Sequence, residues 1–154
     1  MALSETPRGW SWIFVQALIF LLILLTPRLI DLPLPLWFRG FGWLFIAFAA
    51  YLGSGALLAL GQSMSIFPKP RPDASLVRSG PYRLVRHPIY SALILGTLGW
   101  SLWRQHLLGL VLGLVLGAFF DRKSRHEEKL LLLKYPEYAS FRAQTPYRLL
   151  PWLY

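Results

Sequence analysis

Four apolar segments divide the chain and predict its helices. They cover residues 10–25, 41–61, 89–103 and 107–120, and most of the charged residues and prolines lie between or after them. Only the segment 41–61 reaches the roughly 20 residues that cross a bilayer core as a helix. The third and fourth segments, at 15 and 14 residues, extend only about 21 to 23 Å as helices. They therefore need flanking residues, tilt or a thinner membrane to cross it.

The polar stretches predict how these helices are joined. Residues 104–106 form a turn, and residues 62–88 contain five prolines, which disfavour a continuous helix and indicate a structured loop. The tail, residues 121–154, is expected to start as a helix, break at Pro136 and continue in a short helix over 137–144. Glycines spaced four apart, at Gly109, Gly113 and Gly117, predict close helix packing.

The amino-acid composition indicates the environment in which the chain folds. With 55% hydrophobic and only 15% charged residues, the chain is too apolar for a soluble domain of its size. We expect an all-α integral membrane fold, one domain over residues 1–154 with about four transmembrane helices, in which the third and fourth form a short hairpin. The first segment lacks a small-residue cleavage site after it and is expected to be a retained helix.

The charge distribution predicts the orientation. Of the 16 Lys and Arg residues, thirteen lie in the N-terminus, the loop 62–88 and the tail 121–154, whereas Arg28, Arg39 and Arg104 lie in the opposite connections. Positive charge marks the cytoplasmic side, so both termini, the loop and the tail are expected in the cytoplasm, with a bacterial inner membrane as the location. The positive residues behind the net charge of +9 are then expected to contact anionic lipid head groups, and no nucleic-acid partner is expected.

Some kinds of site are disfavoured by the residue types present. The chain has no cysteine, which excludes disulfides, thiolate nucleophiles and thiolate metal sites. His87, His126, Glu127 and Glu128 lack the helical His and Glu spacings of metal sites, so no metal is expected. No serine lies in a nucleophile elbow.

The densest polar cluster is residues 79–90, Ser-Gly-Pro-Tyr-Arg-Leu-Val-Arg-His-Pro-Ile-Tyr. Pro88 suits the first turn of a helix, which places Arg86 and His87 at a helix N-terminus, where a carboxylate or phosphate is favoured. A basic membrane-border anchor, with Tyr82 and Tyr90 as interfacial aromatics, is an equal alternative on these residues alone.

A second cluster follows the fourth apolar segment, where Glu127 and Glu128 stand among Arg122, Lys123, Arg125 and Lys129. Solvated ion pairs on a helix surface are the simpler interpretation. Neighbouring helical residues point about 100° apart, so two carboxylates that serve one ligand must address different parts of it. A cation or a pair of hydroxyls would suit them.

Together the two clusters resemble a known signature. Residues 79–90, followed some 37 residues later by Glu127 and Glu128, resemble the Arg-His-Pro-x-Tyr and Glu-Glu signature of the isoprenylcysteine carboxyl methyltransferases and the related phospholipid methyltransferases. Residues 135–142 and 147–151 also look like the closing segment of that family. The resemblance covers about half of the chain, from residue 70 to residue 151.

The resemblance implies a membrane-embedded methyltransferase that uses S-adenosylmethionine and releases S-adenosylhomocysteine. Its cofactor site would be made by the loop, the start of the third helix and the acidic helix. Carried over by position, the cofactor-binding candidates are Tyr82, Arg86, His87, Pro88, Tyr90, Glu127 and Glu128. Arg142 of the closing segment and Glu127 are the catalytic candidates, with Arg142 orienting the acceptor.

The implied acceptor is a lipophilic small molecule or lipid that enters from the bilayer and is methylated at the cytoplasmic interface. Ala92 and the pair Tyr135-Pro136 depart from residues common in the family, which argues against the classical prenylated-protein substrate. Two alternatives stay open. One is a membrane reductase of the sterol-reductase type, whose NADPH would engage Arg71, Arg78 and Arg83, and the other is a non-enzymatic membrane anchor or assembly protein.

Overall fold

A computed structural model describes residues 9–27, 33–63, 65, 67 and 72–154. In this part of the chain all regular structure is helical, which confirms the all-α prediction. Arg8, Arg28, Lys69 and Arg71, used above to predict orientation and cofactor choice, lie outside the described residues. The α-helices are α1 (Trp10–Leu25), α2 (Phe38–Leu60), α3 (Pro88–Trp103), α4 (Leu107–Lys134) and α5 (Tyr138–Gln144), with 3-10 turns at Gly61–Ser63 and Gly80–Arg83.

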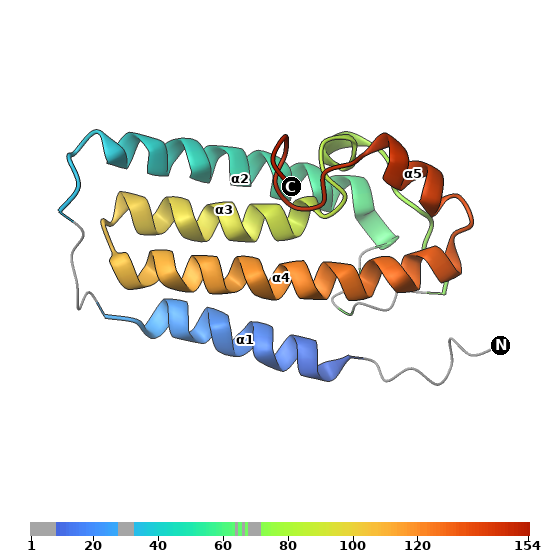
Figure 1. Ribbon diagram of the computed structural model, residues 1–154, viewed down its shortest axis with the longest axis horizontal. Coiled ribbons are helices and arrows are strands. Elements are labelled where there is room, and N and C mark those ends of the chain that lie inside the picture. Colours follow the sequence, from blue (N-terminus) through green and yellow to red (C-terminus); the bar gives the residue numbers. More distant parts are fainter. Residues whose placement is uncertain (1–8, 28–32, 64, 66, 68–71) are drawn as a thin grey trace.

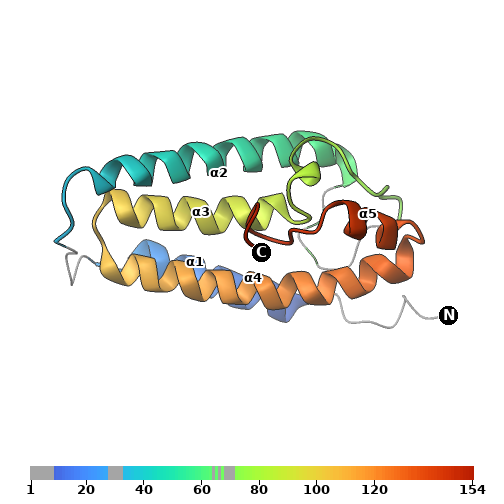
Figure 2. The same cartoon turned by 45° about the horizontal axis from the view of Figure 1, so that its top comes forward.

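The four long helices lie side by side along their length (Figure 1). Helix α3 lies between α2 and α4, and α1 packs along the other side of α4, as the turned view in Figure 2 also shows. The connection after α1 meets the turn after α3 at one end, where the Gln105 side-chain amide donates to the Leu34 carbonyl. At the same end Arg39, at the start of α2, donates to the Gln105 side-chain oxygen over 3.3 Å. At the other end, the Trp10 ring meets Phe67 of the loop at 5.2 Å between centroids. The polar connections are thus sorted to two ends of the bundle.

Glycines bring α3 close to both of its neighbours. A Cβ added at Gly99 would lie 2.7 Å from the Gly42 carbonyl oxygen, and one at Gly113 would lie 2.6 Å from a methyl of Leu98. One at Gly109 would come equally close to the Ser101 side chain. The predicted packing role is confirmed for Gly109 and Gly113, because side chains at these positions would force the helices apart.

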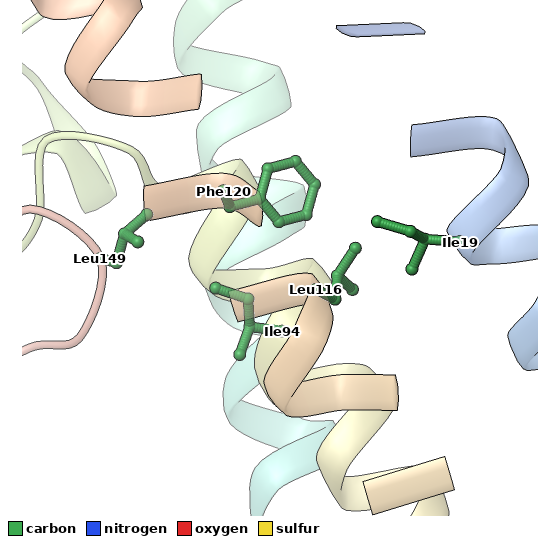
Figure 3. Close-up of a cluster of buried hydrophobic side chains, with 5 residues drawn as sticks. All are labelled: Ile19, Ile94, Leu116, Phe120 and Leu149. Carbon is green, nitrogen blue, oxygen red and sulfur yellow. The ribbon is translucent and has the colours of Figure 1, made fainter. Parts of the chain in front are cut away.

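The main apolar cluster joins α1, α3, α4 and the C-terminal segment (Figure 3). Its members are Ile19, Ile94, Leu116, Phe120 and Leu149. Leu116 and Phe120 are fully buried and occupy successive turns of one face of α4. The C-terminal segment is therefore fixed to the bundle beside the start of α3.

Helix α4 is a single helix of 28 residues. It passes without a break from the fourth apolar segment into the charged run, and it ends just before Tyr135-Pro136, where proline disfavours helical geometry in the residue before it. The acidic pair Glu127 and Glu128 is therefore held on the same rigid helix that packs against α3.

One described helix is long and apolar enough to cross a membrane, and that is α2, while α1 is apolar but shorter. Only 17% of the most apolar window of α2 is buried, and side chains such as Trp43 and Leu58 face outward. A core helix of a soluble protein would be mostly buried. This surface suits membrane association, and the count of four spans stays a prediction.

Candidate active site

The start of α3 is tied to the C-terminal segment by backbone hydrogen bonds. The amide of Arg86 donates to the Tyr147 carbonyl at 3.0 Å, and the amide of His87 donates to the Arg148 carbonyl at 3.1 Å. The buried Ser91 hydroxyl contacts the carbonyls of both His87 and Leu149. Residues some 60 positions apart are thus held in register around the Arg-His-Pro sequence.

The Arg86 guanidinium uses three of its five N–H donors in bonds inside the protein. Its Nε donates to Glu128 Oε1 at 2.7 Å, and its Nη1 donates to the carbonyls of Thr145 and Pro146 at 2.7 and 2.6 Å. The side chain is only 6% exposed. The open anion site expected at this helix start is therefore largely taken up by the protein's own groups.

Glu128 is the centre of a buried charge cluster. Besides Arg86, its Oε1 lies 3.3 Å from His87 Nε2 and 3.4 Å from Arg148 Nε. Burial alone would raise the pKa of this carboxyl, but the hydrogen bonds and charges of His87 and Arg86 outweigh it and lower the pKa from 4.5 to about 2. The interpretation of a solvated surface pair is wrong for Glu128, which is 4% exposed.

Glu127 points elsewhere, as adjacent helical positions must. Its Oε2 accepts a hydrogen bond from the Tyr90 hydroxyl at 2.8 Å and lies 3.8 Å from His87 Nδ1. The His87 and Tyr90 rings are parallel, 5.4 Å apart. His87 therefore stands between the two carboxylates, with one ring nitrogen toward each.

Glu127 borders a cavity of about 310 Å³, here called the interhelical cavity. Its polar wall includes Gln16, Tyr82, Arg86, His87, Tyr90, Lys123, Glu127 and Tyr138. Its apolar wall includes Leu76, Ile89, Leu93, Leu131, Tyr135 and Phe141. The Tyr135 hydroxyl donates to the Ala74 carbonyl at 2.5 Å, which anchors the loop wall to the end of α4.

The structure brings together five of the predicted site residues in this cavity, Tyr82, Arg86, His87, Tyr90 and Glu127. Burial and the nearby Glu127 raise the pKa of Tyr82, which keeps its hydroxyl protonated. The other three do not line the cavity. Pro88 and Glu128 are buried behind it, and Arg142 is exposed on α5, so their predicted roles stay predictions.

Three cavity residues were missed by the sequence analysis. Lys123 on α4 donates to Gln16 on α1 at 2.6 Å. Tyr138 of α5 is buried, and its hydroxyl has no hydrogen-bond partner among the residues that the structure describes. The spacing of Lys123 from Glu127, one helical turn, was the available signal. It was hidden because Lys123 stands in a run of basic residues that resembles a solvated surface.

Comparison with known proteins decides the family. The model of a family described as phospholipid methyltransferase matches residues 37–137, about two thirds of the chain. The chain belongs to this family. The matched region contains α2, the loop, α3 and α4, and therefore most of the cavity wall. The predicted resemblance is thereby confirmed.

Individual relatives within curated proteins agree. The chain is 36% identical over 110 residues to the protein-S-isoprenylcysteine O-methyltransferase of Schizosaccharomyces pombe, covering 66% of this chain and 45% of that protein. It is 36% identical to the cobalt-zinc-cadmium resistance protein CzcN of Cupriavidus metallidurans and 30% identical to the nickel-cobalt-cadmium resistance protein NccN of Alcaligenes xylosoxydans xylosoxydans, each over 77 residues, 49% of this chain and 36% of the relative. The chain thus spans less than half of these relatives.

The names of two relatives raise the question of a metal site. Among the residues that the structure describes, no group of three or more His, Asp or Glu side chains is arranged to hold a metal ion. The family membership itself favours methyl transfer over the reductase alternative.

Proposed function

We propose that this member of the phospholipid methyltransferase family is an S-adenosylmethionine-dependent methyltransferase with a lipophilic acceptor. The observation that carries the proposal is the meeting of Glu127, His87 and Tyr90 at one cavity inside the region that matches the family. These three residues come from two helices and are fixed to one another by contacts of 2.8 and 3.8 Å.

The chemistry of the cavity wall fits this cofactor. A carboxylate at Glu127 suits hydroxyl or ammonium groups, and the aromatic and aliphatic side chains of Leu76, Tyr135 and Phe141 suit a flat adenine. A volume of about 310 Å³ falls at the lower end of the range usual for small-molecule sites, roughly 300 to 1,000 Å³. When bound, the cofactor supplies a methyl group already activated by its sulfonium.

The protein's task is then to position the reactants and to exclude water. The bond from His87 toward Glu128 and the bond from Tyr90 to Glu127 hold the polar wall in one arrangement. An amine acceptor must lose a proton, and His87 or Glu127 is placed to take it, whereas a carboxylate acceptor needs no base. Arg142 keeps its proposed role in orienting the acceptor from α5.

A lipophilic acceptor is supported by the surroundings of the cavity. Leu93 and Ile89 of α3 and Leu60 at the end of α2 line it, and α1 and α2 carry outward-facing apolar side chains. An apolar tail lying among lipid would therefore reach the cavity from the side, with its reactive head at the interface. The name of the fission yeast relative, an isoprenylcysteine O-methyltransferase, agrees with an acceptor of this kind.

The proposed placement is a bacterial inner membrane with four spans and both termini in the cytoplasm. The orientation is supported by the sorting of the connections. The segment that carries Arg78, Arg83 and Arg86 lines the cavity, whereas Arg39 at the start of α2 and Arg104 at the end of α3 lie at the other end of the bundle. Positive charge prefers the cytoplasmic side.

The test is binding followed by transfer. Purified protein in detergent should bind S-adenosylhomocysteine in calorimetry and should not bind NADPH, the reverse of the reductase alternative. With radiolabelled S-adenosylmethionine and host membrane extracts, label should appear in a molecule that partitions into organic solvent. Absence of both cofactor binding and transfer would favour the anchor alternative.

A further inference from the structure

Lys123 is a buried cation in the cavity wall to which no role has yet been assigned. Its side chain is 2% exposed and lies on α4, one turn before Glu127. Its Nζ donates to Gln16 Oε1 at 2.6 Å and lies 5.2 Å from the centre of the Tyr90 ring and 5.9 Å from that of Phe120. An amide oxygen and two ring faces thus surround the ammonium.

Two neighbouring cations, the buried Arg86 and the half-buried Arg148, contact carboxylates, and Lys123 does not. Arg86 pairs with Glu128 at 2.7 Å, and Arg148 pairs with Asp121 at 3.1 Å. In the described part of the chain no carboxylate oxygen lies within 4.0 Å of Lys123 Nζ. Burial disfavours a charge that no carboxylate contacts, and it lowers the pKa of Lys123, with the more distant Glu127 carboxylate opposing the shift.

The donor capacity of the ammonium is also unfilled. It has three N–H donors, and Gln16 accepts one of them. The ring faces of Tyr90 and Phe120 attract a cation but accept no conventional hydrogen bond. Because Lys123 lines the interhelical cavity, a ligand there can supply the missing acceptors and the missing negative charge together.

We propose that Lys123 is the anion-binding residue of the interhelical cavity and holds a carboxylate group of a bound reactant. Two reactants of the proposed function can carry such a group, the amino-acid end of the methyl donor and an acidic acceptor. Glu127 lies one turn further along the same face of α4, so the wall offers a cation and a carboxylate close together, the arrangement that an amino-acid zwitterion requires. The inference deepens the proposed function and rests on it.

The experiment uses two neutral variants, Lys123→Met and Lys123→Gln, so that binding can still be measured on one if the other fails to fold. Lys129→Met is the matched control, since Lys129 is exposed on the same helix and does not line the cavity. Calorimetry measures S-adenosylhomocysteine against 5′-methylthioadenosine, which lacks the amino-acid end. A second pair of ligands, dodecanoate and dodecanol, differs only in the acidic head.

If the carboxylate belongs to the donor, both Lys123 variants should bind S-adenosylhomocysteine roughly 10- to 100-fold more weakly, the usual value of a hydrogen bond to a charged group. Affinity for 5′-methylthioadenosine should not change. If the carboxylate belongs to the acceptor, the affinity of the Lys123 variants for dodecanoate should fall by a similar factor. Their affinities for dodecanol, S-adenosylhomocysteine and 5′-methylthioadenosine should not change.

Unchanged affinity for both carboxylate ligands in variants that are folded by circular dichroism would overturn the assignment of Lys123. The proposed function fails by a different result, namely wild-type protein that binds neither S-adenosylhomocysteine nor 5′-methylthioadenosine. In that case the dodecanoate comparison still decides whether Lys123 holds a carboxylate.

Discussion

Arg86 and Glu128, 42 residues apart in sequence, form a buried ion pair of 2.7 Å that joins the start of α3 to α4. Both side chains are at most 6% exposed. The Arg86 guanidinium continues the link to the carbonyls of Thr145 and Pro146. One interaction thus connects three segments that surround the cavity.

Removal of the Glu128 charge should destabilise the fold strongly. The variant Glu128→Gln leaves the Arg86 guanidinium buried without its counter-charge, a change worth about 3 kcal/mol or more. Thermal unfolding in detergent, followed by circular dichroism, measures the loss. The control is Glu137→Gln, since the Arg78–Glu137 pair is 3.6 Å long and more than 40% exposed on both sides, and it should change stability by less than about 1 kcal/mol. Equal effects of the two variants would contradict the buried pair.

The titration of the Glu128 carboxyl should also appear in the pH dependence of the free energy of unfolding. The pKa of Glu128 is about 2 in the folded protein against 4.5 ordinarily, so the unfolded chain binds more protons between these values. The contribution of the ionised Glu128 carboxylate to the free energy of unfolding is fully present above pH 4.5. It is lost as the pH falls toward 2, by up to about 3 kcal/mol. Unfolding midpoints between pH 5 and 2.5 should fall more steeply for the wild type than for Glu128→Gln. Parallel curves would show that Glu128 titrates normally.

Glu127 should behave differently from its neighbour. It lines the cavity with a side chain 22% exposed, so Glu127→Gln should cost little stability. Affinity for S-adenosylhomocysteine should fall about 10- to 100-fold, because a charge-assisted hydrogen bond is lost. Calorimetry on Glu127→Gln and on the control Glu137→Gln separates binding from general damage. Unchanged affinity in Glu127→Gln would remove Glu127 from the cofactor site.

The sequence predicted which residues would lie in the site but not the direction in which their side chains point. The apolar range 10–25 coincides with α1, and Pro88 begins α3 as expected, because apolar runs and helix-starting prolines are local signals. The pairing of Arg86 with Glu128 and the burial of Lys123 depend on the rotation of α4 against α1 and α3. Rotation is set by packing between distant segments. Helix α4 is apolar on all sides before Asp121 and polar on all sides over residues 121–129, so its sequence carries little amphipathic pattern to reveal the rotation.

Close packing of α2 against α3 should be sensitive to a single methyl group. A Cβ at Gly99 would lie 2.7 Å from the Gly42 carbonyl oxygen and 2.8 Å from Phe45 Cβ, so Gly99→Ala should lower stability by about 1 to 3 kcal/mol. Gly96→Ala is the control on the same helix, where the added atom would meet only Ala49 Cβ at 3.6 Å. There the gain in helix propensity should make the change neutral or stabilising. A similar loss in both variants would contradict the tight contact at Gly99.

The orientation can be tested directly because the chain has no cysteine. Leu36→Cys and Ala139→Cys place single thiols at exposed positions, in the connection after α1 and on α5 beside the cavity-lining Tyr138. With α2, α3 and α4 as three spans between them, the two thiols must face opposite sides. In intact bacterial cells a membrane-impermeant maleimide should therefore label Leu36→Cys only, and it should label both after permeabilisation. Labelling of Ala139→Cys in intact cells would contradict a cytoplasmic cavity, and labelling of both variants would contradict an odd number of spans between the two positions.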